Sequence, residues 1–272
     1  MSNEERKGAT KMLLKGKNAI IYGAAGGVGS AVAKAFSREG ATVFLAGRTL
    51  SSLEKVASEI SRTGGEVEVA KVDALSPKLV EEHLQKVVEK VGKLDVSFNL
   101  ISADVGMGNS LTQLTEEQFT NFAFTVARAN FVTATAAARQ MEKQGGGVIL
   151  CLTAINARIP RPDTGGFSVA GAAIEALCRQ LALEVGARGV RVVCLRTGGT
   201  PDNPVLQEVF SELAKVGRTT KEAIEKSLGE ETALRRLPLL TEVANASVLL
   251  ASDYASAITA TAVDASCGDI VD

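Results

Sequence analysis

The chain has 272 residues, and 30 basic side chains against 31 acidic ones leave a formal net charge of -1. This balance excludes a strongly basic protein that binds nucleic acid or an anionic membrane surface. The length is enough for one large α/β domain with a substantial buried core.

The N-terminal segment MSNEERKGATKM is polar and lacks the apolar region of a secretory signal, and we expect residues 1–15 to form a flexible N-terminus. No apolar stretch reaches membrane-spanning length without a charge or a glycine. The cysteines lie far apart without the spacing of metal ligands, and three of them lie in apolar runs. We therefore expect buried thiols, no metal site, no membrane association and a cytoplasmic protein. The cysteines are Cys151, Cys178, Cys194 and Cys267.

Short apolar, β-branched runs alternate with longer helical patterns from residue 17 onward. The expected strands are NAIIYG, ATVFLAG, VEVAKVD, LDVSFNLI, GGVILCLT, VRVVCLRT and ITATAVDAS. The expected helices span about 26–40, 50–63, 76–92, 115–143, 166–187, 203–228 and 241–252. This alternation predicts an α/β fold, a single Rossmann-like, doubly wound parallel sheet of about seven strands with helices on both faces. No linker or internal repeat divides the chain, so residues 1–272 are expected to form one domain.

The first strand–helix–strand unit is IIYGAAGGVGSAVAKAFSREGATVFLAGR, which has the context of a dinucleotide-binding fingerprint. Gly23 would make the sharp turn after the strand, Gly27 would let the backbone approach a pyrophosphate, and Gly29 would let the helix pack tightly on the strand. The helix N-terminus then directs N–H groups and the positive end of its dipole at the phosphates. Three glycines could instead form only a tight turn, but the flanking strands favour a dinucleotide site.

The end of the second strand predicts the choice of cofactor. Gly47 stands where an acidic residue would bind a ribose 2′-hydroxyl, and Arg48 and Thr49 follow it. An Arg can pair with a 2′-phosphate, so we expect NADP(H) rather than NAD(H), although Arg48 could also be an exposed loop cation. Asp73, at the end of the third strand, could accept from the adenine amino group or cap the helix that begins near Ser76.

These residues resemble the short-chain dehydrogenase/reductase family over nearly the whole chain. The family's glycine motif, Thr-Gly-x-x-x-Gly-x-Gly, matches residues 22–29, with Tyr in place of Thr. The segment NLIS at 99–102 is a degenerate copy of the family's Asn-Asn-Ala-Gly motif. The segment RTGGT at 196–200 resembles its Pro-Gly turn. The C-terminal ITATAVDASCG resembles its closing strand. The resemblance implies an NAD(P)-binding domain that assembles as a homodimer or homotetramer. The expected cofactor-binding residues are Gly23, Gly27, Val28, Gly29, Arg48, Thr49, Asp73, Ala74, Asn99, Ile101, Thr197 and Gly198.

The catalytic positions implied by the resemblance are mostly not kept. Aligned on GGVILCLTA and RGVRVV, the family's Ser falls at Ala154, its Tyr at Phe167 and its Lys at Gly171. Only the active-site Asn is kept, as Asn130. Losing the Tyr removes a general acid, which typically costs on the order of 10²–10⁴ in rate, whereas positioning of hydride donor and acceptor is a separate contribution.

A displaced copy of the missing motif is excluded by inspection. No Lys occurs between Lys143 and Lys215, and the tyrosines of the chain are Tyr22 and Tyr254. His83 is expected on the polar helix after the third strand, away from the carboxyl ends of the strands.

Side chains that could take over part of the missing catalytic role are found in the polar loop NARIPRPD. Asn156 could donate a hydrogen bond to an oxyanion, and Arg158 or Arg161 could stabilise one electrostatically. Asp163 could act as an acid only if burial raised its pKa. For each residue taken alone, we favour a solvated loop role.

Other segments are expected to border the substrate. The glycine loop SADVGMGNS, with Asp104 and Asn109, would line the nicotinamide, and residues 200–238 form an amphipathic stretch that we interpret as a substrate lid. Ser168 is expected to be an ordinary residue of an early helical turn, in a Gly- and Ala-rich helix suited to close packing between subunits.

Three functions remain open. The first is an NADP(H)-dependent oxidoreductase that transfers a hydride to or from a carbonyl or activated alkene of a small molecule, with non-standard proton donation. The second is an inactive regulator that binds NADP(H), and the third is a structural partner of an active relative. The phosphate-binding turn and Arg48 place the oxidoreductase ahead.

Overall fold

The computed structural model of the protein describes residues 12–102, 110–217 and 219–271. In this part of the chain the strands form one seven-stranded sheet in the order β3-β2-β1-β4-β5-β6-β7, and every neighbouring pair is parallel. The predicted fold class is therefore confirmed. The strands are β1 Asn18–Tyr22, β2 Thr42–Gly47, β3 Val67–Lys71, β4 Val96–Asn99, β5 Gly147–Ala154, β6 Val190–Thr197 and β7 Thr261–Ala265.

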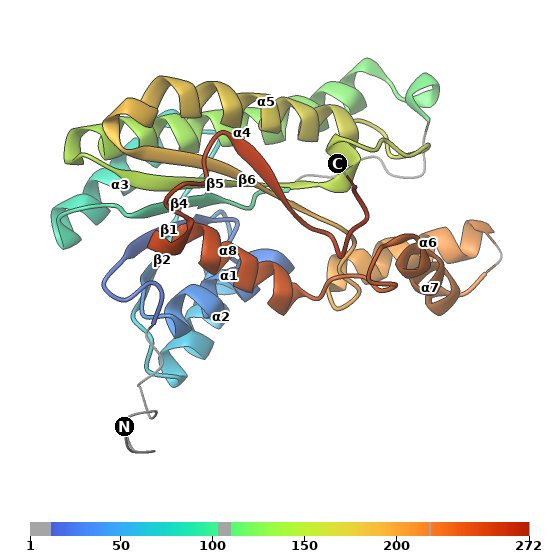
Figure 1. Cartoon of the computed structure of the whole chain (residues 1–272), viewed down its shortest axis with the longest axis horizontal. Helices are drawn as coiled ribbons and strands as arrows, with labels where there is room; N and C mark the ends of the chain where they lie inside the picture. Colours follow the sequence, from blue (N-terminus) through green and yellow to red (C-terminus); the bar gives the residue numbers. More distant parts are fainter. Residues whose placement is uncertain (1–11, 103–109, 218, 272) are drawn as a thin grey trace, which may run out of the picture.

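The helices cover both faces of the sheet, with α3, α4 and α5 above it in Figure 1 and α1, α2 and α8 below it. Residues of β1 show why the strands are continuously apolar. Ile20 and Tyr22 pack in the core under α3, α4 and α5, whereas Ala19 and Ile21 pack in the core against α1 and α8. The helices are α1 Gly27–Arg38, α2 Leu50–Arg62, α3 Pro77–Val91, α4 Glu116–Gln144, α5 Phe167–Val185, α6 Pro204–Gly217, α7 Lys221–Glu231 and α8 Leu240–Ala251.

Two boundaries differ from the sequence-based expectation. The expected helix at 203–228 is two helices, α6 and α7, because Thr220 caps a new helix by accepting a hydrogen bond from the Ala223 N–H at 3.2 Å. The flexible N-terminus was expected to extend to residue 15, but the packed structure begins before that. Leu14 is completely buried, and its N–H donates to the Glu39 carbonyl at 2.9 Å. Residues 1–11 lie outside the described residues.

The sheet order fixes where a ligand site can form. Strand order reverses between β1 and β4, and all carboxyl ends of the parallel strands lie at one edge. The turns after β1, β4, β5 and β6 therefore meet at that edge. The α6–α7 pair lies beyond the sheet, at the right in Figure 1. None of the helices in the described ranges has the length and apolarity needed to cross a membrane.

Candidate functional site

The glycine-rich turn after β1 is kept free of side chains by steric necessity. Gly23 has φ +76°, and a Cβ there would lie 2.7 Å from the Leu100 carbonyl oxygen, in the turn after β4. A Cβ on Gly29 would lie 2.3 Å from the Gly23 carbonyl oxygen and 2.9 Å from Ala24 Cα. The packing roles predicted for these two glycines are confirmed, and α1 is held close against β1.

Gly27 begins α1, after an N-cap residue, Gly26, that has no side chain to satisfy the helix N-terminus. The first N–H groups of a helix lack intrahelical partners, so those of Gly27 and Val28 are available to an anion. A Cβ on Gly27 would lie 2.5 Å from Oδ1 of Asn203, the residue before α6. The bare turn therefore fits the phosphates of a dinucleotide, with the start of α6 adjoining it.

The residues after β2 are solvent-accessible. Gly47 ends the strand, and a Cβ there would make an ordinary contact, 3.5 Å from Leu53 Cδ2. Arg48 is exposed and makes no hydrogen bond or ion pair with a residue in the described part of the chain. Thr49 is the N-cap of α2, and its side chain accepts no capping hydrogen bond. Both side chains are free to contact a ligand beside the glycine turn.

The hydrogen bonds of the turn after β3 distinguish between the two roles considered for Asp73, which are adenine contact and helix capping. Its Oδ1 accepts from the Leu75 N–H at 3.0 Å and so shapes the turn. Ser76, not Asp73, caps α3 by accepting from the Leu79 N–H at 3.4 Å. Capping is therefore excluded as the role of Asp73. Ala74 is buried beneath the turn.

Two buried amides differ in how fully they are satisfied. Asn99 donates to Thr133 Oγ1 at 2.7 Å and accepts from the Ile101 N–H at 3.0 Å, so its side chain holds the turn after β4. Asn130 donates to the Val126 carbonyl at 3.0 Å, but its Oδ1 is buried without a partner among the described residues. Because an unpaired buried acceptor is costly, Asn130 Oδ1 is poised to accept from a water or a ligand.

The predicted catalytic positions lie together at the carboxyl edge. Ala154 ends β5, and Phe167 begins α5 with its ring 5.9 Å from that of Phe122. A Cβ on Gly171 would lie 2.8 Å from the Cβ of Ala157, in the 3-10 turn Ile155–Ala157. No side chain fits at Gly171 unless that turn moves. Position 171 is therefore closed by packing.

In the loop after β5, the structure supports fewer of the candidate catalytic side chains than the sequence suggested. Arg161 is paired with Glu231 of α7 at 2.9 Å and with Asp269 at 3.5 Å, so it joins the loop to α7 and the C-terminal segment. Asp163 is exposed at φ +58°, and the burial that an acid role required is not found. Asn156 is half-buried, and Arg158 is exposed. Asp104 and Asn109 lie outside the described residues.

Two other polar residues are more buried than an ordinary polar helical position. His83 lies on α3, the helix after the third strand, as predicted, but its side chain is only 9% exposed and its ring is 6.4 Å from that of Tyr22. Burial, followed by the charge of Lys86, lowers the pKa of His83 to about 4. Ser168, expected to be an ordinary helical residue, has its Oγ buried without a partner among the described residues.

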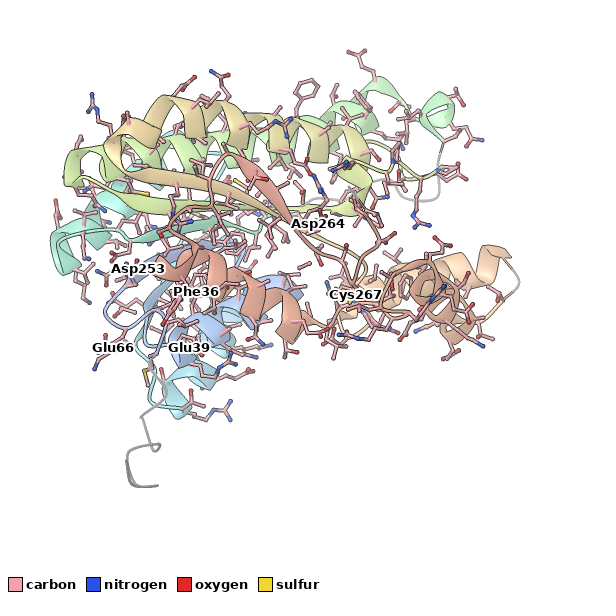
Figure 2. The ribbon with its side chains drawn as sticks, in the orientation of Figure 1. Phe36, Glu39, Glu66, Asp253, Asp264 and Cys267 are labelled. Carbon is pink, nitrogen blue, oxygen red and sulfur yellow. The ribbon has the colours of Figure 1, made fainter. Side chains whose placement is uncertain are left out.

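A buried ion-pair network beneath the site was not anticipated from the sequence. Arg196 of β6 donates to both carboxylate oxygens of Glu175 of α5, at 2.8 and 2.9 Å, and to Asp264 of β7 at 2.8 Å. Thr153 of β5 also donates to Glu175, at 3.2 Å, and Figure 2 labels Asp264 on β7. The hydrogen bonds from Arg196 to Glu175 are the main cause that raises the pKa of Arg196. The available signal was Arg196 near the end of a strand whose other residues are mostly apolar.

The three cysteines in apolar runs form a buried group, as predicted. Cys151 and Cys194 are register partners on β5 and β6, and Cys178 lies on α5. Contact with Cys151 is the largest cause that raises the pKa of the Cys178 thiol. Cys267, labelled in Figure 2, is half-buried, and its carbonyl accepts from the Leu234 N–H at 3.0 Å. Within the described ranges, no group of three or more His, Cys, Asp or Glu side chains is placed to hold a metal ion.

The sheet order, the glycine turn and the strand reversal define an α/β protein of the Rossmann type. The family model described as Enoyl-(Acyl carrier protein) reductase matches residues 23–268. The chain belongs to the short-chain dehydrogenase/reductase family of oxidoreductases. It is 28% identical over 247 residues to a 7alpha-hydroxysteroid dehydrogenase of Clostridium sardiniense, covering 90% of each chain. It is 31% identical to the 3-oxoacyl-[acyl-carrier-protein] reductase FabG of Chlamydia pneumoniae, over 68% of this chain and 74% of that one.

Solved structures share the fold at lower identity. NAD+-bound xylitol dehydrogenase superposes with a TM-score of 0.87 at 22% identity, covering 94% of this chain and 99% of that chain. Actinorhodin polyketide ketoreductase with NADPH gives 0.86 at 22% identity, covering 93% and 97%. These two neighbours hold different nicotinamide cofactors, so the shared fold alone does not choose between them.

Proposed function

We propose that the protein is an NADP(H)-dependent oxidoreductase that transfers a hydride to or from a carbonyl or an activated alkene of a small-molecule substrate. The observation that carries the proposal is the bare glycine turn beside the exposed, unpaired Arg48. The guanidinium of Arg48 would pair with a 2′-phosphate, and the N–H groups at the start of α1 would bind the pyrophosphate. A bound nicotinamide supplies or accepts the hydride.

Proton donation in this enzyme would differ from that implied by the family resemblance. Phe167 and Gly171 stand at the positions of the family's Tyr and Lys, and neither can donate a proton. The unpaired Oδ1 of Asn130 would hold a water close to the site. A conjugated alkene suits this arrangement better than a ketone, because an enolate can be protonated later by water. The match to a family model described as Enoyl-(Acyl carrier protein) reductase supports the same choice.

The assembly and location belong to the same proposal. Exposed apolar side chains on α4 and α5, among them Phe124 and Phe131 on α4 and Leu183 on α5, support a homodimer or homotetramer. Leu183 is 78% exposed, which a subunit contact would reduce. We further propose a cytoplasmic protein without nucleic-acid or membrane partners, as the near-neutral charge suggests.

A second function is favoured by the packing at Gly171. Since the turn that holds Ala157 fills the space beside it, the nicotinamide half of a cofactor would lose one anchoring group. The chain would then serve as an NADP(H)-binding regulator, or as a structural partner of an active relative. In that case the nucleotide binds without turnover.

A fluorescence titration with NADPH and NADH tests the proposal. The chain has no Trp, so the emission of the reduced nicotinamide is measured against a low background. We expect NADPH to bind at least about tenfold more tightly than NADH, a difference of about 1.4 kcal/mol. Incubation of the complex with enones and ketones then distinguishes enzyme from regulator through loss of NADPH absorbance. If neither nucleotide binds, the oxidoreductase and the NADP(H)-binding regulator are both excluded and the structural partner remains.

A further inference from the structure

The C-terminal segment after β7 lies at the edge of the sheet that holds the candidate site. Because β7 is parallel to β6, the residues that follow Ala265 leave the sheet at its carboxyl edge. Ser266 packs on the turn after β6, since a Cβ on Gly198 would lie 3.6 Å from the Cα and the Cβ of Ser266. In Figure 1 the segment, drawn in red, runs from the end of β7 back towards the start of α5. It therefore borders the turn that is expected to bind the cofactor.

Asp269 joins this segment to the loop after β5 through Arg161. Arg161 Nη2 lies 3.5 Å from Asp269 Oδ1 and 2.9 Å from Glu231 Oε2. In the sheet, β6 lies between β5 and β7, so a contact between the segments that follow β5 and β7 lies next to the carboxyl end of β6. Asp269 is thus placed at the part of the edge where a nicotinamide and a substrate would meet.

Asp269 has the burial that Asp163 lacks. The Asp269 side chain is 8% exposed, whereas Asp163 is exposed. Burial is the main cause that raises the pKa of Asp269, while the charge of Arg161 opposes this effect and that of Glu231 adds to it. Arg161 faces Asp269 from the loop after β5, and Glu231 faces it from α7. Since the nearer carboxylate, Glu231, neutralises Arg161, Asp269 is a second, buried acid in a cluster with one cation.

We propose that Asp269 donates the proton that the substrate takes up during reduction. The inference rests on the proposed function. As the hydride reaches the carbonyl or the alkene, negative charge develops on the substrate oxygen. The carboxyl O–H bond of Asp269 breaks, a new O–H bond forms on that oxygen, and Arg161 pairs with the carboxylate that remains. A proton from solvent restores the acid, so each turnover consumes one NADPH and one proton.

The acid of this chain therefore comes from a different element than the family resemblance implies. The family's Tyr position is Phe167, on the first turn of α5, whereas Asp269 follows the last strand of the sheet. The same criterion was applied to both acids considered, since an Asp can act as a proton donor only if its surroundings raise its pKa. Asp269 meets that criterion and Asp163 does not.

A titration of the carboxyl groups tests the assignment without any substrate. Asp residues are labelled with ¹³C at the carboxyl carbon, and their NMR resonances are followed against pH. The resonance that is absent from Asp269→Asn belongs to Asp269. We expect it to titrate at a higher pH than the resonances of exposed Asp residues such as Asp163. Glu231→Gln should lower that pH, because it removes the charge that helps to raise the pKa of Asp269.

Turnover is then measured as loss of NADPH absorbance with the enone or ketone that the wild type reduces fastest. We expect Asp269→Asn to lower the rate by at least about 10²-fold while the NADPH affinity changes by less than about twofold. The wild-type rate should fall as the pH rises through the titration of Asp269, and Glu231→Gln should move that fall to lower pH. Asp163→Asn is the matched control, because it removes an exposed carboxylate of the same loop at φ +58°, which Asn adopts readily, and it should keep the wild-type rate.

Two results overturn the inference and leave the proposed function standing. One is a rate for Asp269→Asn within about threefold of the wild type, since loss of a general acid costs far more. The other is an Asp269 resonance that titrates no higher than that of Asp163. If Asp269→Asn does not fold, Asp269→Glu removes the same resonance and keeps an acid, and the titration decides. If the wild type binds no nicotinamide cofactor or reduces no compound, the proposed function fails and this inference fails with it.

Discussion

The proposed preference for NADP(H) rests on Gly47 and Arg48. Arg48 is exposed and unpaired in the described part of the chain, and Gly47 ends β2 without a side chain. We predict that Gly47→Asp weakens NADPH by about tenfold or more and leaves NADH equal or tighter, because a carboxylate repels a 2′-phosphate and accepts from a 2′-hydroxyl. Titration of both nucleotides measures the change. Since the new Cβ would lie 3.5 Å from Leu53 Cδ2, the melting temperature should remain close to that of the wild type, and Arg48→Ala should lose NADPH affinity without gaining NADH.

At the same scale, the sequence predicts residues whose roles are local and misses those defined by distant contacts. The positive φ of Gly23 and the contact of Gly29 with the Gly23 carbonyl oxygen both lie within seven positions, so these glycines could be assigned from their spacing. The pairing of Glu175 with Arg196 joins a helix to a strand 21 positions away, and nothing in either segment names its partner. The contact of Asn203 with Gly27 is more distant still.

At the scale of elements, the 3-10 turn at 155–157 and α5 are packed closely together at Gly171. A Cβ added at Gly171 would lie 2.8 Å from that of Ala157. We predict that Gly171→Ala destabilises the fold by about 1–3 kcal/mol, the usual cost of overpacking, as measured by urea denaturation. Ala157→Gly in the same chain should recover most of that loss by removing the opposing methyl group. An additive double variant would show that the two positions do not touch in solution.

Elements with strong hydrophobic periodicity were predicted correctly, whereas their breaks and inner faces were harder to predict. All seven expected strands are present in the sheet, because strands buried on both faces require continuous apolar runs. The division of 203–228 was missed because both halves are amphipathic and the capping role of Thr220 is visible only in the structure. His83 was correctly placed on the helix after the third strand, but the packing of its ring against Tyr22 was not anticipated.

At the scale of the molecule, a buried ion-pair network joins the strands whose carboxyl ends form the candidate site. The Arg196 network ties β5, β6, β7 and α5 together, and its Thr153 directly precedes Ala154 at the end of β5. Breaking a buried ion pair by removing one partner typically costs about 3–5 kcal/mol, so this network restrains the edge on which the nicotinamide would lie. The side chains at that edge can differ from those of relatives while the sheet beneath keeps its geometry.

The stability of the whole molecule should depend on pH through His83. Its pKa in the folded protein is lowered to about 4, against 6.5 for the ordinary side chain, because the imidazolium would be buried beside Tyr22 and repelled by Lys86. As the pH falls below about 6.5, the unfolded chain binds this proton and the folded chain does not, so the free energy of unfolding decreases until about pH 4. A difference of this size corresponds to a loss of about 3 kcal/mol. Urea denaturation between about pH 6.5 and pH 4 should show that the free energy of unfolding falls by about 3 kcal/mol more in the wild type than in His83→Gln, because Gln cannot titrate. Equal pH dependence of the two proteins would mean that His83 is protonated in the folded state as readily as in the unfolded chain.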